Sequence, residues 1–158
     1  MKNIKILAFL LFFVATNGCG FTVLDQREIK NYEILEIKSL GDKKVNFFLK
    51  NELNNLLHTN EASDKLIINI KTEKTKSIKE KNKKNQITKY NIKIDSLVEL
   101  NFVNKDLTKS LMLENEGFYN VNKNHSITLN NQRNLEKNLN DKLSQDLSSK
   151  ILKMINEF

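Results

Sequence analysis

The chain has 158 residues, of which 28% are charged and 39% hydrophobic, and its formal net charge is +7 at pH 7. A length of this order suits one ordinary domain with a modest core. A single cysteine excludes an intrachain disulfide, so packing alone must stabilise the fold. The positive charge favours polyanionic partners, unless the many Lys and Asn residues reflect only the base composition of the genome.

The N-terminal residues have the organisation of an export signal. A basic start precedes an apolar run, Ile6–Ala15, and the small residue Gly18 stands immediately before Cys19. The Gly-Cys pair resembles the lipobox of bacterial lipoproteins, in which the signal is cleaved before the cysteine and the thiol is diacylated. Thr16 departs from this pattern, because lipoboxes usually have Leu three residues before the cysteine.

An uncleaved membrane span is the alternative reading of Ile6–Ala15. A helix needs about 20 apolar residues to cross the hydrocarbon core, and this run has roughly half of that. We therefore predict a lipoprotein signal peptide at residues 1–18, a lipidated tether at 19–30 and a single domain at 31–158. Cys19 is the predicted lipidation site, which would hold the chain on a membrane through its acyl chains. Such an exported chain is expected to meet anionic lipid or phosphorylated glycolipid, and no nucleic acid.

The first half of the predicted domain alternates between strand and helix patterns. Tyr32–Lys38 has the period-two alternation of a strand, and Asp42 is placed to cap a helix. Apolar residues then recur at three- and four-residue steps from Val45 to Leu57, which predicts one helix. A polar connector follows, and the apolar segment Leu66–Ile70, with three β-branched isoleucines, predicts a second strand.

The segment 71–86 is rich in lysine and almost free of apolar residues. We predict a long hairpin tip or a frayed strand extension here. Ammonium groups suit phosphates of a lipid or glycolipid as point charges, whereas a solvated, mobile loop is the plainer alternative. No aromatic residue interleaves the run, so stacking on nucleic-acid bases is not indicated. The lysines of this run are Lys71, Lys74, Lys76, Lys79, Lys81, Lys83 and Lys84.

The second half has the clearest alternation in the chain. Residues 87–102 place an apolar or small side chain at nearly every second position, which predicts a long antiparallel strand with one wet face. After a turn at 104–106, residues 108–121 predict a further strand, with a bulge predicted at Gly117. A connector at 122–130 then leads to an amphipathic helix whose stripe runs from Leu135 to the C-terminus.

Together these elements have the order β-α-β-β-β-α. A sheet with one apolar face and two one-sided helices predicts an α+β fold, a two-layer sandwich of a four-stranded mixed sheet with both helices packed on one face. The first β-α-β unit suits a crossover between parallel strands, and the last three strands suit an antiparallel meander.

Residues that commonly bind metals or catalyse reactions are few and scattered. His58 and His125 are far apart, and neither has a second ligand at helical spacing. Glu114 and Glu116 share one strand face, where a solvated face is favoured over an acid–base pair, which would need a pocket. We therefore predict no catalytic residues, no metal and no cofactor, and the chain is not expected to be an enzyme.

Several of these features resemble the LPS-assembly lipoprotein family, LptE. Members begin their mature chain with Cys-Gly-Phe, as Cys19–Phe21 would here, and share the element order and size. Residues 88–90 are similar to the start of the family's Glu-Tyr-x-Leu strand, and residues 131–147 resemble its terminal helix. Two features depart from the family: Leu24–Arg27 replaces the usual Arg-Gly, and the prolines before the first strand are missing.

The resemblance implies an outer-membrane, lipid-anchored protein with its domain on the periplasmic side and within a barrel lumen. Such proteins plug an outer-membrane β-barrel of the LptD type, help it to fold, and contact lipopolysaccharide on its way to the cell surface. On this resemblance, the candidate lipopolysaccharide contacts are Lys79, Lys81, Lys83 and Lys84. Gly20 is compatible with outer-membrane sorting, because lipoproteins retained inside often have Asp there.

Two other classes of protein stay open. One is a lipoprotein of another envelope-assembly pathway that acts as a general periplasmic interaction module. The other is a binding domain held in the inner membrane by an uncleaved N-terminus. Copurification with a large barrel would favour an LptE-like protein over the first class. The mass of the native chain would identify the second class, because an uncleaved chain keeps its N-terminus and a lipoprotein begins at acylated Cys19.

Overall fold

The computed structural model describes residues 32–57 and 64–155. The predicted signal peptide, the predicted lipidation site Cys19, the predicted tether and His58 lie outside the described residues. The described elements are β1 (Tyr32–Gly41), α2 (Lys43–Leu57), β2 (Asp64–Lys81), β3 (Ile87–Phe102), the short 3-10 helix η2 (Val103–Lys105), β4 (Leu107–Asn120) and α3 (His125–Ile155). No helix among them is long and apolar enough to cross a membrane.

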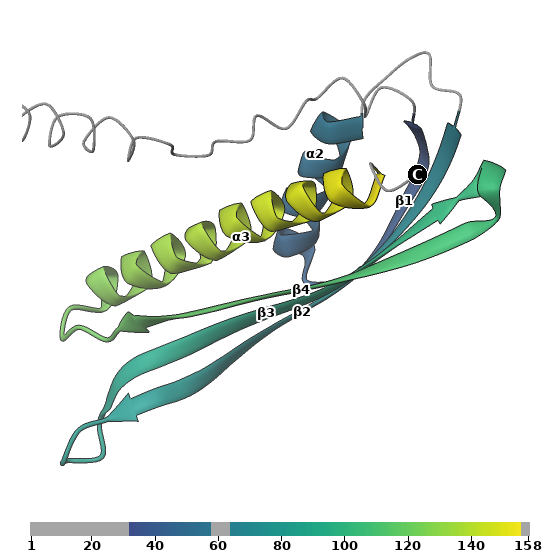
Figure 1. Cartoon of the computed structure of the whole chain (residues 1–158). Coiled ribbons are helices and arrows are strands. Elements are labelled where there is room, and N and C mark those ends of the chain that lie inside the picture. Colours follow the sequence, from purple (N-terminus) through teal and green to yellow (C-terminus); the bar gives the residue numbers. More distant parts are fainter. Residues whose placement is uncertain (1–31, 58–63, 156–158) are drawn as a thin grey trace, which may run out of the picture.

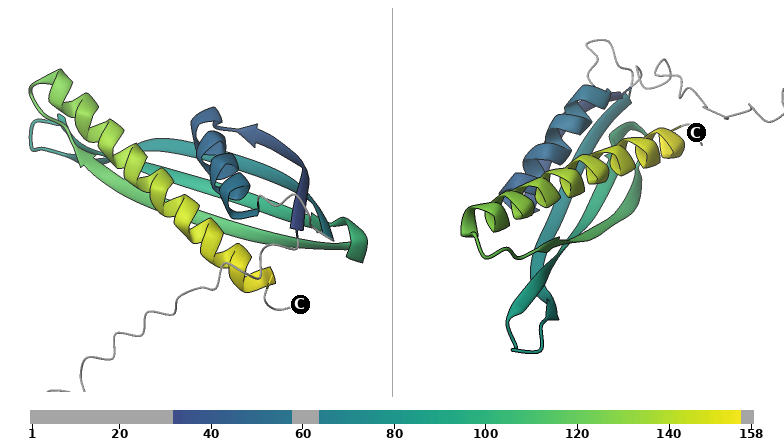
Figure 2. Two further views of the ribbon diagram at one scale, coloured as in Figure 1. Left: turned by 90° about the horizontal axis from the view of Figure 1, so that it is seen from above. Right: turned by 90° about the vertical axis from the view of Figure 1, so that its left-hand side faces the viewer.

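The four strands form one sheet in the order β1-β2-β3-β4. β1 and β2 are parallel, and the other two neighbouring pairs are antiparallel, as the crossover and the meander predict. The sheet is strongly twisted, and α2 and α3 lie on the same side of it (Figures 1 and 2). The predicted α+β fold, with a four-stranded mixed sheet and two helices packed against it, is confirmed.

The period-two pattern of β3 decides which face of the sheet forms the core. Ile92, Ile94, Val98 and Leu100 are buried, while the odd-numbered residues between them are only partly covered. The helices bury their stripes against this face, with Leu49 and Leu53 from α2 and Leu143, Leu147 and Ile151 from α3 fully or almost fully buried. Burial of apolar area is the main favourable term in such a fold, so the alternation of β3 fixes the two layers.

The start of α2 is fixed by the predicted cap. The Asp42 Oδ1 atom accepts hydrogen bonds from the backbone N–H of Lys44 (3.0 Å) and of Val45 (2.9 Å). Two N–H groups that have no partner within the helix are therefore satisfied, which favours a helix beginning at Lys43. β1 extends past its predicted end at Lys38 and reaches Gly41, immediately before this cap.

α3 is longer than its apolar stripe predicts. It begins at His125, so the connector expected at 122–130 is wrong over most of its length, and His125 is the first helical residue. The Asn124 Oδ1 atom caps the helix by accepting from Ser126 N–H at 2.9 Å, and Thr128 Oγ1 accepts from Asn122 N–H at 2.8 Å. The first turns carry polar residues that do not reach the core, so periodicity alone could not locate the start.

Gly117 does not mark a bulge. It pairs with Ile92 in an uninterrupted register between β3 and β4, which contradicts the prediction. A Cβ at this position would lie 2.7 Å from Leu135 Cδ1, so the glycine lets α3 approach β4 closely. The missing side chain is therefore a packing feature of the helix–sheet contact.

The substitution Gly41→Ala is expected to destabilise the fold strongly. Gly41 has φ +102°, and an added Cβ would lie 1.8 Å from the backbone oxygen of Thr72 on the paired strand β2. We expect a loss of about 3 kcal/mol or more in the free energy of unfolding, measured by chemical denaturation. Gly117→Ala is the matched control with a loss of about 1 kcal/mol, because the tip of Leu135 can rotate away. Equal losses for the two variants would contradict this account.

Candidate functional site

The lysine-rich segment is regular structure in its larger part. β2 continues to Lys81, far beyond the predicted end at Ile70, and pairs with β3 along almost its full length. Of the two forms predicted for 71–86, a long hairpin tip and a frayed strand extension, the structure has the hairpin. β2 is paired to its end, and only the tight connection at 82–86 lies outside the two strands. The hairpin of β2 and β3 projects beyond the start of α3 and forms one end of the molecule (Figure 1).

Asn82 organises the turn at the hairpin tip. Its Oδ1 atom accepts from the backbone N–H of Lys84 (2.9 Å) and of Gln86 (3.0 Å), and its side-chain amide donates to Gln86 Oε1 (3.0 Å). Asn85 adopts φ 61°, a left-handed conformation that asparagine tolerates well. Short polar residues therefore close the hairpin without glycine or proline.

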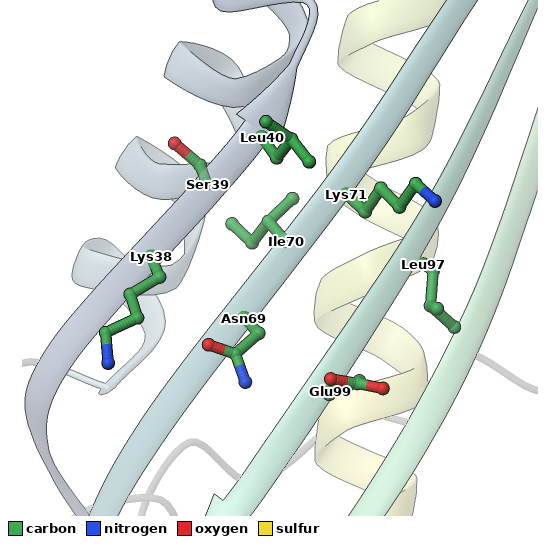
Figure 3. A pocket seen from close by; sticks show the side chains of 8 residues that line it. All are labelled: Lys38, Ser39, Leu40, Asn69, Ile70, Lys71, Leu97 and Glu99. Carbon is green, nitrogen blue, oxygen red and sulfur yellow. The ribbon is translucent and has the colours of Figure 1, made fainter.

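The pleat of β2 divides the predicted lysine run between the two faces of the sheet. Lys74 and Lys76 lie on the face covered by the helices, where both contact α3. Lys71 lies on the open face, and Figure 3 shows it beside Leu97 of β3 in a shallow hollow of about 320 Å³. A run that is continuous in sequence is thus separated in space, because successive side chains of a strand point to opposite faces.

Aromatic residues from β3 and β4 meet the lysines of β2. The Lys76 ammonium lies 4.3 Å from the ring centre of Tyr90, which stacks on Tyr119 with ring centres 5.7 Å apart. On the open face, the Lys79 ammonium lies 4.2 Å from the ring centre of Phe118. Cation–π contacts of this kind hold the long lysine side chains in place.

Sequence reasoning missed these aromatic partners. The rings lie outside the lysine run along the chain, and only the strand register brings them to it. The pair Ile78↔Tyr90 places Tyr90 next to β2, and Tyr90↔Tyr119 places Tyr119 beside Tyr90. The pair Asn91↔Phe118 places Phe118 on the other face. A register derived from the paired alternation of the two strands is the signal that would have found them.

The predicted contact residues Lys79, Lys81, Lys83 and Lys84 are all exposed at this end of the hairpin. Lys81 ends β2, and Lys83 and Lys84 lie in the turn. Glu80 is the nearby acid, and its carboxylate pairs with Lys89 at 2.5 Å and accepts from Thr88. The hydrogen bonds from Lys89 and Thr88 lower the pKa of Glu80, so its negative charge is already matched within the strand pair. The tip therefore presents net positive charge.

A polar network fixes the base of the hairpin to both helices. Lys74 Nζ lies 3.0 Å from Asp42 Oδ2 and 3.9 Å from Glu136 Oε2, and Lys44 Nζ lies 3.2 Å from the same Glu136 oxygen. Gln132 donates to Glu136 Oε1 (2.8 Å) and accepts from Lys76 (3.1 Å). These contacts join β2, the start of α2 and the middle of α3.

The two carboxylates of this network keep their charge against partial burial. Burial alone would raise the pKa of Asp42, but hydrogen bonds from the Val45 N–H and Lys74 and the charge of Lys74 outweigh it and lower that pKa. Burial likewise opposes ionisation of Glu136, while hydrogen bonds from Gln132 and Lys44 and the charges of Lys74 and Lys44 lower its pKa. Both carboxylates of the network are therefore ionised at neutral pH and are balanced by hydrogen-bond donors and lysine charges.

The carboxylates on the open face have the ordinary pairing of a solvated surface. Glu114 lies opposite Asp95, and Lys93 bridges them at 3.1 Å and 3.0 Å. The hydrogen bonds that the Lys93 ammonium donates to the carboxylates of Asp95 and Glu114 raise the pKa of Lys93. Glu116 lies one pair further along β4 and reaches Asn91 Nδ2 at 3.5 Å. Within residues 32–57 and 64–155, no group of three or more His, Cys, Asp and Glu side chains could hold a metal ion.

Comparisons with known proteins bear on the fold. No known family profile and no curated protein matches the sequence. The fold is nevertheless that of small bacterial lipoproteins. Rare lipoprotein B from Shewanella oneidensis superposes with a TM-score of 0.52 at 12% identity, over 77% of this chain and 94% of that one.

A minor lipoprotein from Acinetobacter baumannii gives a similar result. Its TM-score is 0.50 at 10% identity, over 75% of this chain and 92% of that one. At these identities the likeness is one of fold. The expectation drawn from the LptE resemblance is confirmed at that level, because rare lipoprotein B belongs to the LptE family.

Removing the central ammonium of the network is expected to weaken the fold and change its response to acid. The folded state lowers the pKa of both carboxylates, and this stabilises the fold when the pH is above their ordinary pKa values of 3.8 for Asp42 and 4.5 for Glu136. The stabilisation is lost as the pH falls through the lower pKa values of the folded state. Lys74→Met should cost about 1–2 kcal/mol in the free energy of unfolding at pH 7. It should also make the loss of stability below about pH 4.5 smaller than in the wild type.

The control for this experiment is Lys71→Met, the same substitution at an exposed position on the opposite face of β2. Its denaturation curves between pH 3 and pH 7 should follow those of the wild type. If Lys74→Met also followed the wild type throughout, the network would not stabilise the fold.

Proposed function

We propose that this chain is an outer-membrane lipoprotein that binds and plugs a β-barrel of the LptD type and assists lipopolysaccharide transport and insertion at the cell surface. It acts as a binding protein and not as an enzyme. The observation that carries the proposal is the likeness in fold to rare lipoprotein B over nearly the whole of that chain. Cys19, after an export signal, supports a lipid anchor in the outer membrane.

The surface of the domain supports a place within a barrel lumen. The interiors of large outer-membrane barrels are polar, so a plug must present a polar outer face. Here the open face of the sheet carries Lys93, Asp95, Glu114 and Glu116, and most of the exposed residues of both helices are polar. The main apolar cluster lies between the sheet and the helices.

The basic hairpin tip supports contact with lipopolysaccharide. Lipopolysaccharide carries several phosphate groups and is polyanionic. At the tip, four exposed lysines lie within six residues of chain: Lys79, Lys81, Lys83 and Lys84. The paired strands and the Asn82 turn hold these lysines at one end of the molecule, which lowers the entropy lost on binding.

Purification of the full chain from detergent-solubilised outer membranes tests the proposed function. With a C-terminal tag, one dominant transmembrane barrel of the LptD type should copurify, and intact mass should show a chain that begins at acylated Cys19. Cys19→Ser should remove the acyl mass from the chain, because serine lacks the thiol that is acylated. A chain that starts at Met1 with a free thiol would contradict the proposed anchor.

The copurified barrel also decides between this function and the alternative. A general periplasmic interaction module would yield no dominant barrel. The absence of a copurified barrel, under conditions in which other envelope complexes survive, would overturn the proposed function in favour of that alternative.

Charge reversal at the hairpin tip is expected to weaken lipopolysaccharide binding. The triple variant Lys81→Glu, Lys83→Glu, Lys84→Glu should bind purified lipopolysaccharide about tenfold more weakly at low salt, with a smaller difference at high salt. The matched control reverses three exposed lysines of α3, Lys137, Lys142 and Lys153. Both variants change net charge equally, so equal loss in both would show that total charge, and not the tip, governs binding.

A further inference from the structure

The outer edge of β1 differs from the opposite edge of the sheet. At the β4 edge, Lys150 Nζ donates to the backbone oxygen of Met112 (2.9 Å) and Asn131 Nδ2 donates to that of Asn120 (3.1 Å). α3 side chains thus satisfy part of the β4 edge. β1 is the terminal strand on the other side, and among residues 32–57 and 64–155 no further strand pairs with it. Such an edge is a template for an added strand.

Only the second half of β1 offers a regular template. A register irregularity between Ile34 and Glu36 disturbs the first half, and bulges commonly prevent pairing there. From Ile37 to Gly41 the register with β2 is unbroken. An added strand of about five residues therefore fits this half alone.

A hollow of about 520 Å³ lies beside this half of β1. Leu40 and Gly41 line it from the strand, and Lys43, Phe47 and Lys50 line it from α2. No residue of β2 is among its lining residues, so it opens on the outer side of the edge. Its apolar walls are unusually open to solvent, with Leu40 68% exposed and Phe47 61% exposed.

The charges around this hollow select the chemistry of a partner. Lys43 and Lys50 belong to its lining, which contains no carboxylate. A second copy of this chain would bring a matching set of lysines to the edge, so like charges oppose self-pairing. An extended segment with an apolar side chain for the hollow and carboxylates beside it is complementary in shape and charge.

We propose that residues 37–41 of β1 accept an acidic, extended segment of the barrel partner as an additional strand. An apolar side chain of that segment enters the hollow between Leu40 and Phe47, and its carboxylates pair with Lys43 and Lys50. Main-chain hydrogen bonds along the edge supply affinity, while the hollow and the lysines supply register and specificity. This inference rests on the proposed function, because it names the surface that grips the barrel.

Photocrosslinking in the cell envelope tests the inference directly. A benzophenone amino acid replaces Phe47 in the full, tagged chain, and the linked peptide is identified by mass spectrometry. The expected product joins position 47 to an acidic extended segment of the barrel. The same amino acid at Ile127, an exposed apolar position on α3, is the control and should not label that segment.

Charge reversal supplies the second measurement. Lys43→Glu with Lys50→Glu should reduce the yield of copurified barrel about tenfold. Lys137→Glu with Lys142→Glu, the control with equal charge, should leave it unchanged. Glutamate at position 43 in the first turn favours the start of α2, so the pair is expected to fold, which circular dichroism verifies.

The outcomes separate this inference from the proposed function. A barrel that copurifies without any link from position 47, or with links only to this chain, to a second copy or to lipid, overturns the strand-addition inference and leaves the proposed function standing. The absence of any copurified barrel overturns both.

Discussion

Glu136 is the group on which the arrangement of the elements depends most. Its carboxylate lies in the partly buried contact between α3, β2 and the start of α2, where an uncompensated charge would be costly. Lys44 and Lys74 supply the opposite charge and Gln132 a hydrogen bond, so the charge is retained only when all three elements are in place. Through Gln132 the same network reaches Lys76 and Tyr119, and thus the projecting hairpin.

Packing of both helices on one face of the sheet determines which surfaces stay available. Within residues 66–76 of β2 and 92–102 of β3, even-numbered residues lie on the face that α2 and α3 cover, and odd-numbered ones lie on the open face. The hairpin projects past the start of α3, and β1 remains a strand edge. A binding role at the tip and one at the edge therefore do not compete for the same residues.

The sequence predicted the elements whose pattern is repeated and local. The alternation of residues 87–102 was sufficient to predict β3, and Asp42 was sufficient to predict the start of α2, since each signal depends on neighbouring residues alone. The polar start of α3, the face of each lysine and the partners Tyr90 and Phe118 could not be read in this way. The faces and partners depend on strand register. The start of α3 depends on the Asn124 cap and on the bond between Asn122 N–H and Thr128, in a segment without a periodic apolar pattern.

The direction of β2 relates the proposed anchor to the proposed binding site. Tyr32, the first residue of β1, pairs with Asp64 at the start of β2, and β2 then runs 18 residues to the hairpin tip. At about 3.3 Å per residue, the tip lies roughly 60 Å along the strand from the end at which the chain enters from Cys19. The hydrocarbon core of a bilayer is about 30 Å thick. A domain anchored by Cys19 on the inner leaflet and aligned with a barrel axis would thus be long enough to bring its lysines to the far side of the membrane, where lipopolysaccharide must arrive.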